Sequence, residues 1–304
     1  MFDNIIGNDN NKNKLNRIVR TKNVSHSYIF SGISGIGKFL FAKEFAKAIM
    51  CMAEKTERKP CLTCKSCESF KDFNNPDIII IDEGEETIKT ETIKEMVKNV
   101  LEKPVQSKNK VYIINNGEKM TREAQNSLLK TLEEPPEYAV IILVTSNENM
   151  LLNTIRSRCI KISFDKLTDS EIKKYFELSL KNIDNNIIKA AEGSISKALQ
   201  VQENSELYLQ IEEVFENIEK MNELQILQSK DKIFKEKDEA FGSLDYMNTI
   251  FYKKILVDPS KILLYQKCIE IIEQTKLRLK KNSNYDMAID NCLLAIGGSL
   301  KENG

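Results

Sequence analysis

A glycine-rich stretch near the N-terminus has the composition of a phosphate-binding loop. Residues 31–39 read SGISGIGKF and fit the pattern G-x-x-x-x-G-K-[ST] up to its last position. Glycines at this spacing let backbone N–H groups turn toward a polyphosphate, and the lysine adds a positive charge. Phe39 stands where hydrolysing loops have a hydroxyl ligand for Mg²⁺, and a phenyl ring binds no metal. The candidate nucleotide ligands are Gly32, Gly35, Gly37 and Lys38.

Hydrolysis by such a loop also needs an acidic residue at the end of a later strand, and two apolar runs compete for that role. Residues 78–83 read IIIIDE and would supply Asp82 and Glu83, whereas residues 111–116 read VYIINN and end in two amides. The second run is followed by a helix that ends at a double proline and by another strand, as we expect for the strand beside the phosphate loop. We therefore predict that the amides occupy the acidic positions and that Asp82 and Glu83 are solvated. An active ATPase that uses Lys38 with Asp82 and Glu83 is the alternative.

Four of the seven cysteines lie in a short segment after the loop. The spacing of three of them is C-x₂-C-x₂-C, and with a fourth upstream they offer enough thiolates for tetrahedral zinc with no open position, which predicts a structural site. The ferredoxin continuation C-x₃-C-P is absent, so an iron–sulfur cluster is less favoured. The candidate ligands are Cys51, Cys61, Cys64 and Cys67, with His26 as the substitute for Cys51. The other three cysteines are expected in the core.

Length and composition restrict the classes of protein that these motifs can belong to. The chain has 304 residues, 45 basic and 45 acidic, so it lacks the overall positive charge of a stand-alone nucleic-acid binder. No stretch of 18 apolar residues and no charged region leading into an apolar run is found, which predicts a soluble, cytoplasmic protein without membrane contact.

The elements that must position these residues alternate between strand and helix in the first half of the chain. Short runs rich in β-branched residues predict buried parallel strands at residues 28–31, 78–81, 111–114 and 140–144. Helical spacing between them, as in residues 39–52 and 88–101, completes an α/β pattern. Beyond Phe164 only helices are predicted: Thr168 or Asp169 caps the first, with an apolar stripe that runs to Leu180.

These patterns predict three domains. Residues 1–165 form the α/β P-loop domain with the zinc module at residues 51–67, residues 166–204 form a small helical domain, and residues 205–304 form an all-α bundle. Apolar stripes in the bundle include one from Ile211 to Met221 and one from Met287 to Leu294, the latter in a last helix that begins near Asn282.

Several motifs in fixed order resemble a known family. The opening FDNIIGN, the phosphate loop, the cysteine insertion, AQNSLLKTLEEPP and the run Ile155–Cys159 (IRSRC) resemble a bacterial DNA polymerase III clamp loader subunit of the AAA+ class, over residues 1 to about 200. Active members have an arginine in the stretch Gly193–Ser196, where this chain has Ser196 followed by Lys197. With the missing hydroxyl and the missing acidic pair, this third loss favours the delta-prime type over the hydrolysing gamma/tau type.

The resemblance implies a role for a subunit that does not hydrolyse ATP. In this family the Ser-Arg-Cys motif carries an arginine finger supplied to ATP on the neighbouring subunit, and the resemblance assigns that role to Arg158. Arg156 is equally basic, and a plain surface arginine would be the simpler interpretation of this motif alone, but the other motifs together favour the finger. ATP or ADP binding is expected to be weak or absent. The implied partners are gamma/tau and delta subunits, joined through the C-terminal bundle as a collar, the sliding clamp, and primer-template DNA within the complex.

Two interpretations stay open beside this one. Basic residues of the first half could line a path for DNA phosphates, although solvated helix faces explain them as well; they are Lys110, Lys119, Arg122 and Lys130. A zinc-stabilised protein that senses nucleotide without joining a ring is the alternative from a different functional class.

Overall fold

The chain divides into two compact units in a computed structural model. Unit 1 comprises Met1–Ala198 and unit 2 comprises Leu199–Gly304. The structure describes residues 1–53, 59–71, 75–180, 183–234, 240–281 and 283–302. The sequence-based prediction of three domains stays a prediction, because compactness separates only the C-terminal helices from the rest.

Unit 1 is built on a five-stranded parallel sheet with the strand order β2-β3-β4-β1-β5. The strands are β1 (Ser27–Ser31), β2 (Ile78–Ile81), β3 (Lys110–Ile114), β4 (Ala139–Thr145) and β5 (Ile160–Ser163). The four predicted strands are confirmed. The fifth was missed because only Ile162 of its four residues is buried, so it lacks the continuous apolar run of a central strand.

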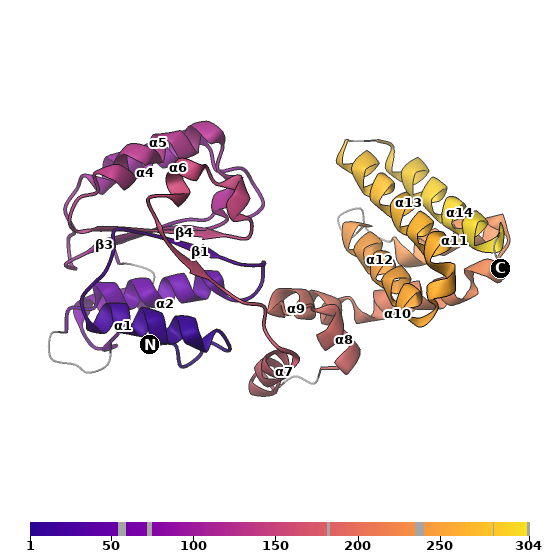
Figure 1. The fold of residues 1–304 in the computed structure, drawn as a ribbon, viewed down its shortest axis with the longest axis horizontal. Coiled ribbons are helices and arrows are strands. Elements are labelled where there is room, and N and C mark those ends of the chain that lie inside the picture. The colour runs from indigo at the N-terminus through magenta and orange to yellow at the C-terminus, as the bar shows by residue number, and fades with distance from the viewer. Residues whose placement is uncertain (54–58, 72–74, 181–182, 235–239, 282, 303–304) are drawn as a thin grey trace. The chain divides into compact units, whose positions relative to one another are not determined.

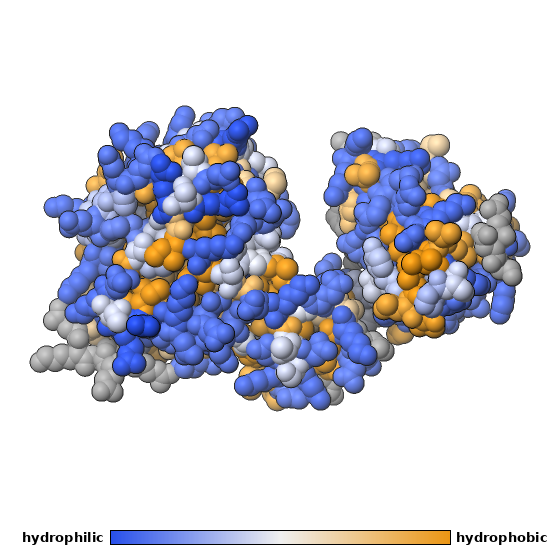
Figure 2. Space-filling model, in the orientation of Figure 1, coloured by the Kyte–Doolittle hydropathy of each residue, from blue (hydrophilic) through white to orange (hydrophobic). Residues whose placement is uncertain are grey.

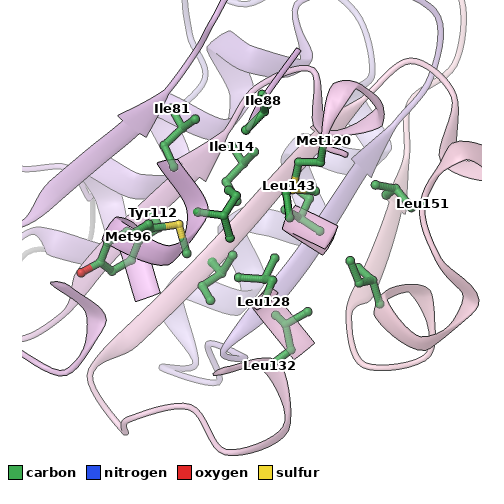
Figure 3. Packing of buried hydrophobic residues seen from close by; sticks show 14 of the residues in the cluster. Ile81, Ile88, Met96, Tyr112, Ile114, Met120, Leu128, Leu132, Leu143 and Leu151 are labelled. Carbon is green, nitrogen blue, oxygen red and sulfur yellow. The ribbon is translucent and has the colours of Figure 1, made fainter. Parts of the chain in front are cut away.

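Helices cover both faces of the sheet (Figure 1). One face is packed by α1 (Asp9–Arg20) and α2 (Lys38–Met50), the other by α4 (Thr90–Val100), α5 (Arg122–Glu133) and the short α6 (Asn153–Arg156). Figure 3 shows the core on the second face, where Tyr112 and Ile114 of β3 and Leu143 of β4 pack with Leu128 and Leu132 of α5. This packing holds the carboxyl ends of the strands, and the loops that follow them, in fixed relative positions.

The neighbours of β1 differ from the sequence-based prediction. We expected the strand at residues 111–114 beside the phosphate-loop strand β1. Instead, the two neighbours of β1 are β4 and β5, and β3 lies beyond β4. The order of helices and strands along the chain does not show which strands are neighbours, because the crossover connections of a parallel sheet can pass over a strand. β2 is an edge strand, separated from β1 by both β3 and β4. The structural condition for the active-ATPase alternative, β2 beside β1, is therefore not met.

Three short helices follow β5, namely α7 (Asp169–Leu178), α8 (Asn185–Ala190) and α9 (Ile195–Glu203). Thr168 caps α7 as predicted, and the Glu171 side chain returns the contact in a capping box. Ile172 and Phe176 are buried, but the prediction for Leu180 is wrong: α7 ends at Leu178, and Leu180 is 96% exposed in a left-handed turn. We call α7, α8 and α9 the lid.

The described residues of unit 2 form helices and the turns between them. Its helices are α10 (Ser205–Asn217), α11 (Glu223–Ile233), α12 (Ala240–Val257), α13 (Ile262–Lys280) and α14 (Tyr285–Glu302). Ile211, Phe215 and Ile289 are buried as predicted, whereas Met287 is 64% exposed. Asn282 lies outside the described residues. Figure 2 shows apolar surface gathered over α12 and α13.

Other elements of the chain are short. A helical turn α3 (Lys65–Lys71) follows the cysteines, and 3₁₀ turns occur at Gly117–Lys119, Glu148–Met150, Ile218–Lys220 and Pro259–Lys261. The structure also places the three remaining cysteines: Cys268 and Cys292 are buried, and Cys159 is partly buried against the core of unit 1. The expectation of core positions is therefore confirmed for Cys268 and Cys292, whereas Cys159 lies at the border of the core.

Candidate nucleotide loop, metal centre and arginine finger

The phosphate loop, residues 32–38, runs from the end of β1 to the start of α2. Gly37 precedes the helix with φ of +87°, a left-handed conformation that favours glycine. Lys38 is 7% exposed, and its ammonium donates to the carbonyl oxygen of Ile33 over 2.6 Å. Burial lowers the pKa of Lys38 to about 8, although the negative charge of Glu118 acts in the opposite direction. The lysine is therefore bound to a carbonyl of its own loop.

The lid packs directly against the loop at Gly35. The backbone N–H groups of Ile195 and Ser196 donate to the carbonyl oxygen of Gly35 over 3.0 and 3.4 Å. A Cβ atom at Gly35 would lie 2.2 Å from the Ser194 hydroxyl oxygen and 2.7 Å from the Ser196 Cβ, so only glycine fits there. Lys197, which follows Ser196, forms an ion pair with Glu192 at 3.1 Å. The first N–H groups of α9, which could otherwise bind an anion, are thus partly engaged by the loop itself.

The positions that bind magnesium in hydrolysing proteins carry other groups here. The Phe39 ring lies 4.7 Å from the ammonium of Lys43 one turn later, a cation–π contact within α2. At the end of β3 the Asn116 amide donates to the carbonyl oxygen of Gly84, so this side chain is held toward the β2 end of the sheet. Asp82 is exposed and accepts from the N–H of Gly84. Asp82 and Glu83 both follow β2, which β3 and β4 separate from β1 and its loop.

A carboxylate that the sequence analysis did not single out lies nearer to the loop. Glu118 sits in the 3₁₀ turn after β3 and accepts hydrogen bonds from the backbone N–H of Ser146, at 3.0 Å, and from the Ser146 hydroxyl. Burial would raise the pKa of Glu118, but these hydrogen bonds hold it below its usual value. Its spacing does not identify it, because it lies two residues beyond the positions 115 and 116 where the acidic pair is expected.

The four predicted metal ligands come together. The sulfur atoms of Cys51, Cys61, Cys64 and Cys67 all lie within 4.8 Å of one another. Backbone N–H groups point at two of the sulfurs: that of Cys61 at Cys51, over 3.4 Å, and that of Cys64 at Cys61, over 3.3 Å. Burial would raise the pKa of the Cys61 thiol, but the N–H donors of Thr63 and Cys64 lower it to about 6. Such a cluster could bind a metal ion, and its donor set fits zinc.

His26 does not join this cluster. Its Nδ1 lies 3.1 Å from the carbonyl oxygen of Ala139, beside the first strand, where a ring N–H donates to that oxygen. The alternative in which His26 replaces Cys51 as a ligand is therefore not supported by this structure. Cys51 is therefore the fourth member of the cluster, and of the zinc module at residues 51–67 only residues 54–58 lie outside the described chain.

Arg158 lies between α6 and β5, and its guanidinium is bound by groups of its own chain but stays partly exposed. Its guanidinium forms an ion pair with Glu133 at 2.6 Å and donates to the carbonyl oxygen of Thr154 at 2.9 Å, while 34% of the side chain is exposed. Arg156 is directed back to its own segment, where it donates to the side chains of Asn149 and Asn153, and its Nε is buried. Of the two arginines, Arg158 is the more accessible.

A buried glutamine fixes the segment that carries Arg158. Gln125 of α5 donates to the carbonyl oxygens of Met120 and Met150, and its own carbonyl accepts from the N–H of Leu152 at 2.8 Å. Three backbone groups are thus satisfied by one side chain, and two of them, on Met150 and Leu152, lie immediately before α6 begins. This arrangement makes the position of the arginine-bearing segment depend on α5.

The four basic residues that we considered for a DNA path are not alike. Lys110 is 3% exposed, and its ammonium donates to the carbonyl oxygens of Asn99 and Glu102, so the suggestion of a DNA contact is wrong for this residue. Lys119 forms an ion pair with Glu85 at 2.6 Å. Arg122 and Lys130 are exposed on α5, as solvated helix positions usually are.

The fold and this site define an AAA+-type P-loop protein, and comparisons with known proteins narrow the class. The crystal structure of a DNA polymerase III gamma-subunit-related protein from Thermotoga maritima matches 94% of this chain and 98% of its own with a TM-score of 0.52; at 19% identity this supports the fold alone. The family model described as "DNA polymerase III, delta subunit" matches residues 7–168. The chain belongs to this family.

The chain is also similar to two curated proteins of DNA polymerase III. The DNA polymerase III subunit delta′ of Bacillus subtilis is 29% identical over 90% of this chain and 84% of its own length. The tau/gamma subunit of Haemophilus influenzae is 34% identical over 67% of this chain, but the match spans only 30% of that longer protein. In the described part of this chain, we find no helix with the length and apolar character needed to cross a membrane.

Proposed function

We propose that this chain is a non-hydrolysing subunit of the loader that places the sliding clamp of the replicative DNA polymerase III, of the delta-prime type, and that it acts in the cytoplasm. The observation that carries the proposal is the closed phosphate loop: Gly35 is bound by the lid and Lys38 by a carbonyl of the loop. Because Phe39 and two amides replace the metal ligands, bound ATP would lack the Mg²⁺ coordination that hydrolysis needs. Nucleotide binding is accordingly weak or absent.

Arg158 is proposed to act on ATP bound to the neighbouring subunit. A guanidinium is permanently charged and offers a rigid fork of donors, which suits the negative charge that develops on a transferring phosphoryl group. The partial exposure of Arg158 and the anchoring of its segment by Gln125 support this role. The ion pair with Glu133 must then open or turn outward in the assembled ring.

The partners proposed are gamma/tau and delta subunits, the clamp, and primer-template DNA within the assembly. Unit 2 is the proposed collar. It exposes large apolar side chains at the junction of α12 and α13, where Leu256, Val257 and Leu263 are 82%, 86% and 80% exposed. Apolar surface of this kind is typical of a protein–protein contact. The similarity to delta′ over most of the chain also supports this assignment.

Zinc is proposed as a structural ion at the four cysteines. The sulfurs would hold it with no open position, so the ion would stabilise the fold of the module and take no part in catalysis. What the chain's own residues contribute is the orientation of N–H groups toward the sulfurs, which stabilises thiolates.

The proposal is tested by DNA-stimulated ATP turnover in a loader reconstituted from this chain and the gamma/tau and delta subunits of the same organism. Removing an arginine finger typically costs about 10³ to 10⁵ in rate. Arg158→Ala should therefore reduce turnover by orders of magnitude, while Arg156→Ala, the matched control, should leave it close to that of the unsubstituted loader. Loss of the exposed ion pair costs at most about 1 kcal/mol of stability, so the chain should stay folded.

Two results would overturn the proposal. Turnover of ATP by the isolated chain would make it an ATPase, and an unchanged rate with Arg158→Ala would remove the finger. A chain that stays monomeric with gamma/tau and delta subunits would favour the alternative of a stand-alone nucleotide sensor.

A further inference from the structure

The carboxylate of Glu118 lies at the same end of the sheet as the phosphate loop. Its hydrogen-bond partner Ser146 directly follows β4, and the last residue of β4, Thr145, is paired with Ser31 of β1. Ser31 in turn precedes Gly32, the first glycine of the loop. The turn that carries Glu118 is thus held against the strand ends from which the phosphate loop starts.

Only one oxygen of this carboxylate is satisfied. Oε1 accepts both hydrogen bonds from Ser146, whereas Oε2 is buried and has no hydrogen-bond partner among the described residues. A buried anionic oxygen without a partner is costly unless a nearby positive charge balances it. The other acid at this edge, Glu148, differs because it forms an ion pair with Lys161 at 2.5 Å.

The positive charge of Lys38 also lacks a bonded partner of opposite charge among the described residues. Its ammonium is bound by a neutral carbonyl, that of Ile33, and it forms no ion pair within the described chain. In loops that bind nucleotide, the charge of this lysine is balanced by the β- and γ-phosphates. The turn that carries Glu118 lies at the strand ends from which this loop starts, and the negative charge of Glu118 raises the pKa of Lys38 against the effect of burial.

We propose that Glu118 is the internal counter-anion of Lys38. Its negative charge takes the place of the phosphate charge that would balance this lysine in a nucleotide complex, and it thereby weakens the binding of nucleotide to this loop. The inference rests on the proposed non-hydrolysing function and names the residue that helps to enforce it. A carboxylate beside a phosphate raises the free energy of the bound nucleotide unless Mg²⁺ lies between them, and Phe39 removes one ligand that such an ion would use.

The test is calorimetric titration of the full chain with ADP in EDTA and, separately, in Mg²⁺. Glu118→Gln keeps an acceptor for Ser146 but removes the charge, so it should bind ADP more tightly than the unsubstituted chain in EDTA, on the order of tenfold or more. Glu118→Asp keeps the charge and should bind as weakly as the unsubstituted chain. Glu148→Gln, the matched control, removes an acid that is already balanced by Lys161 and should change ADP affinity less than twofold, roughly the limit for a screened surface charge.

Three outcomes would overturn the inference. Glu118→Gln could bind ADP no more tightly than the unsubstituted chain, or Glu118→Asp could gain as much affinity as Glu118→Gln, which would make the effect one of shape. The unsubstituted chain could also bind ADP tightly in Mg²⁺ and lose it with Glu118→Gln, which would make Glu118 a metal ligand. Arg158→Ala in the reconstituted loader reports on the finger independently, so failure of this inference is distinguishable from failure of the proposed function.

Discussion

Replacing Gly35 with alanine should force the lid away from the phosphate loop. The backbone at Gly35 has φ of +77°, and a left-handed conformation costs a residue with a Cβ about 1–2 kcal/mol. The added Cβ would also overlap Ser194 and Ser196, at 2.2 and 2.7 Å, and overpacking of this kind costs about 1–3 kcal/mol. The free energy of unfolding should therefore fall by roughly 2–5 kcal/mol.

Gly37 provides the matched control. Its φ of +87° imposes the same backbone cost, but a Cβ there would meet nothing within 4 Å, so Gly37→Ala should lose only about 1–2 kcal/mol. Urea denaturation measures both losses. Hydrogen exchange localises the effect, because the amides of Ile195 and Ser196 donate to the Gly35 carbonyl and should exchange faster only in Gly35→Ala. Equal losses of stability in the two variants, with unchanged exchange at Ile195, would refute the close packing of lid and loop.

Three further perturbations test other parts of the structure. Gln125→Leu leaves three backbone groups without their partner and should lower the free energy of unfolding by about 2–4 kcal/mol in urea titrations; a loss below about 0.5 kcal/mol would contradict the bonding described. Cys64→Ser should abolish the binding of one zinc ion measured by elemental analysis, while Cys159→Ser should retain it, and retention in both would remove the metal site. Lys38 has a folded-state pKa of about 8, below the usual 10.5, so between these pH values the unfolded chain binds more protons than the folded chain and the free energy of unfolding should rise with pH. Lys38→Met should flatten that rise in urea titrations at pH 8 to 10. An unchanged slope would argue against burial of the charge.

Local patterns in the sequence predicted those elements whose determinants are local. The run of four isoleucines in β2 and the apolar run of β4 indicate strands because buried parallel strands need no polar alternation. Thr168 was identified as a cap because hydroxyls before an apolar stripe satisfy the first N–H groups of a helix. The prediction failed for β5, whose exposed Ile160 and Lys161 obscure its pairing with β1.

The site was predictable only in part, because some of its determinants depend on the tertiary fold. The cysteine spacing sufficed to predict that four sulfurs gather, since three ligands lie within seven residues. Glu118 could not be found from its spacing, because the turn that carries it is held next to the phosphate loop only by the crossover that brings β4, and with it Ser146, beside β1. Lys110 was misjudged for a similar reason: a lysine at the start of a strand reads as exposed until the carbonyls of Asn99 and Glu102 are seen to enclose it.

The edge position of β2 has a consequence for the acidic residues Asp82 and Glu83 that follow it. In the described part of the chain β2 pairs only with β3, so one side of a strand of four isoleucines, three of them partly exposed, offers unpaired backbone groups. Such an edge is a template for strand addition by another copy of the chain. Asp82 and Glu83 follow it directly, and their repulsion between two copies would oppose that pairing. On this argument, replacing both acids with neutral residues would make strand addition at this edge easier.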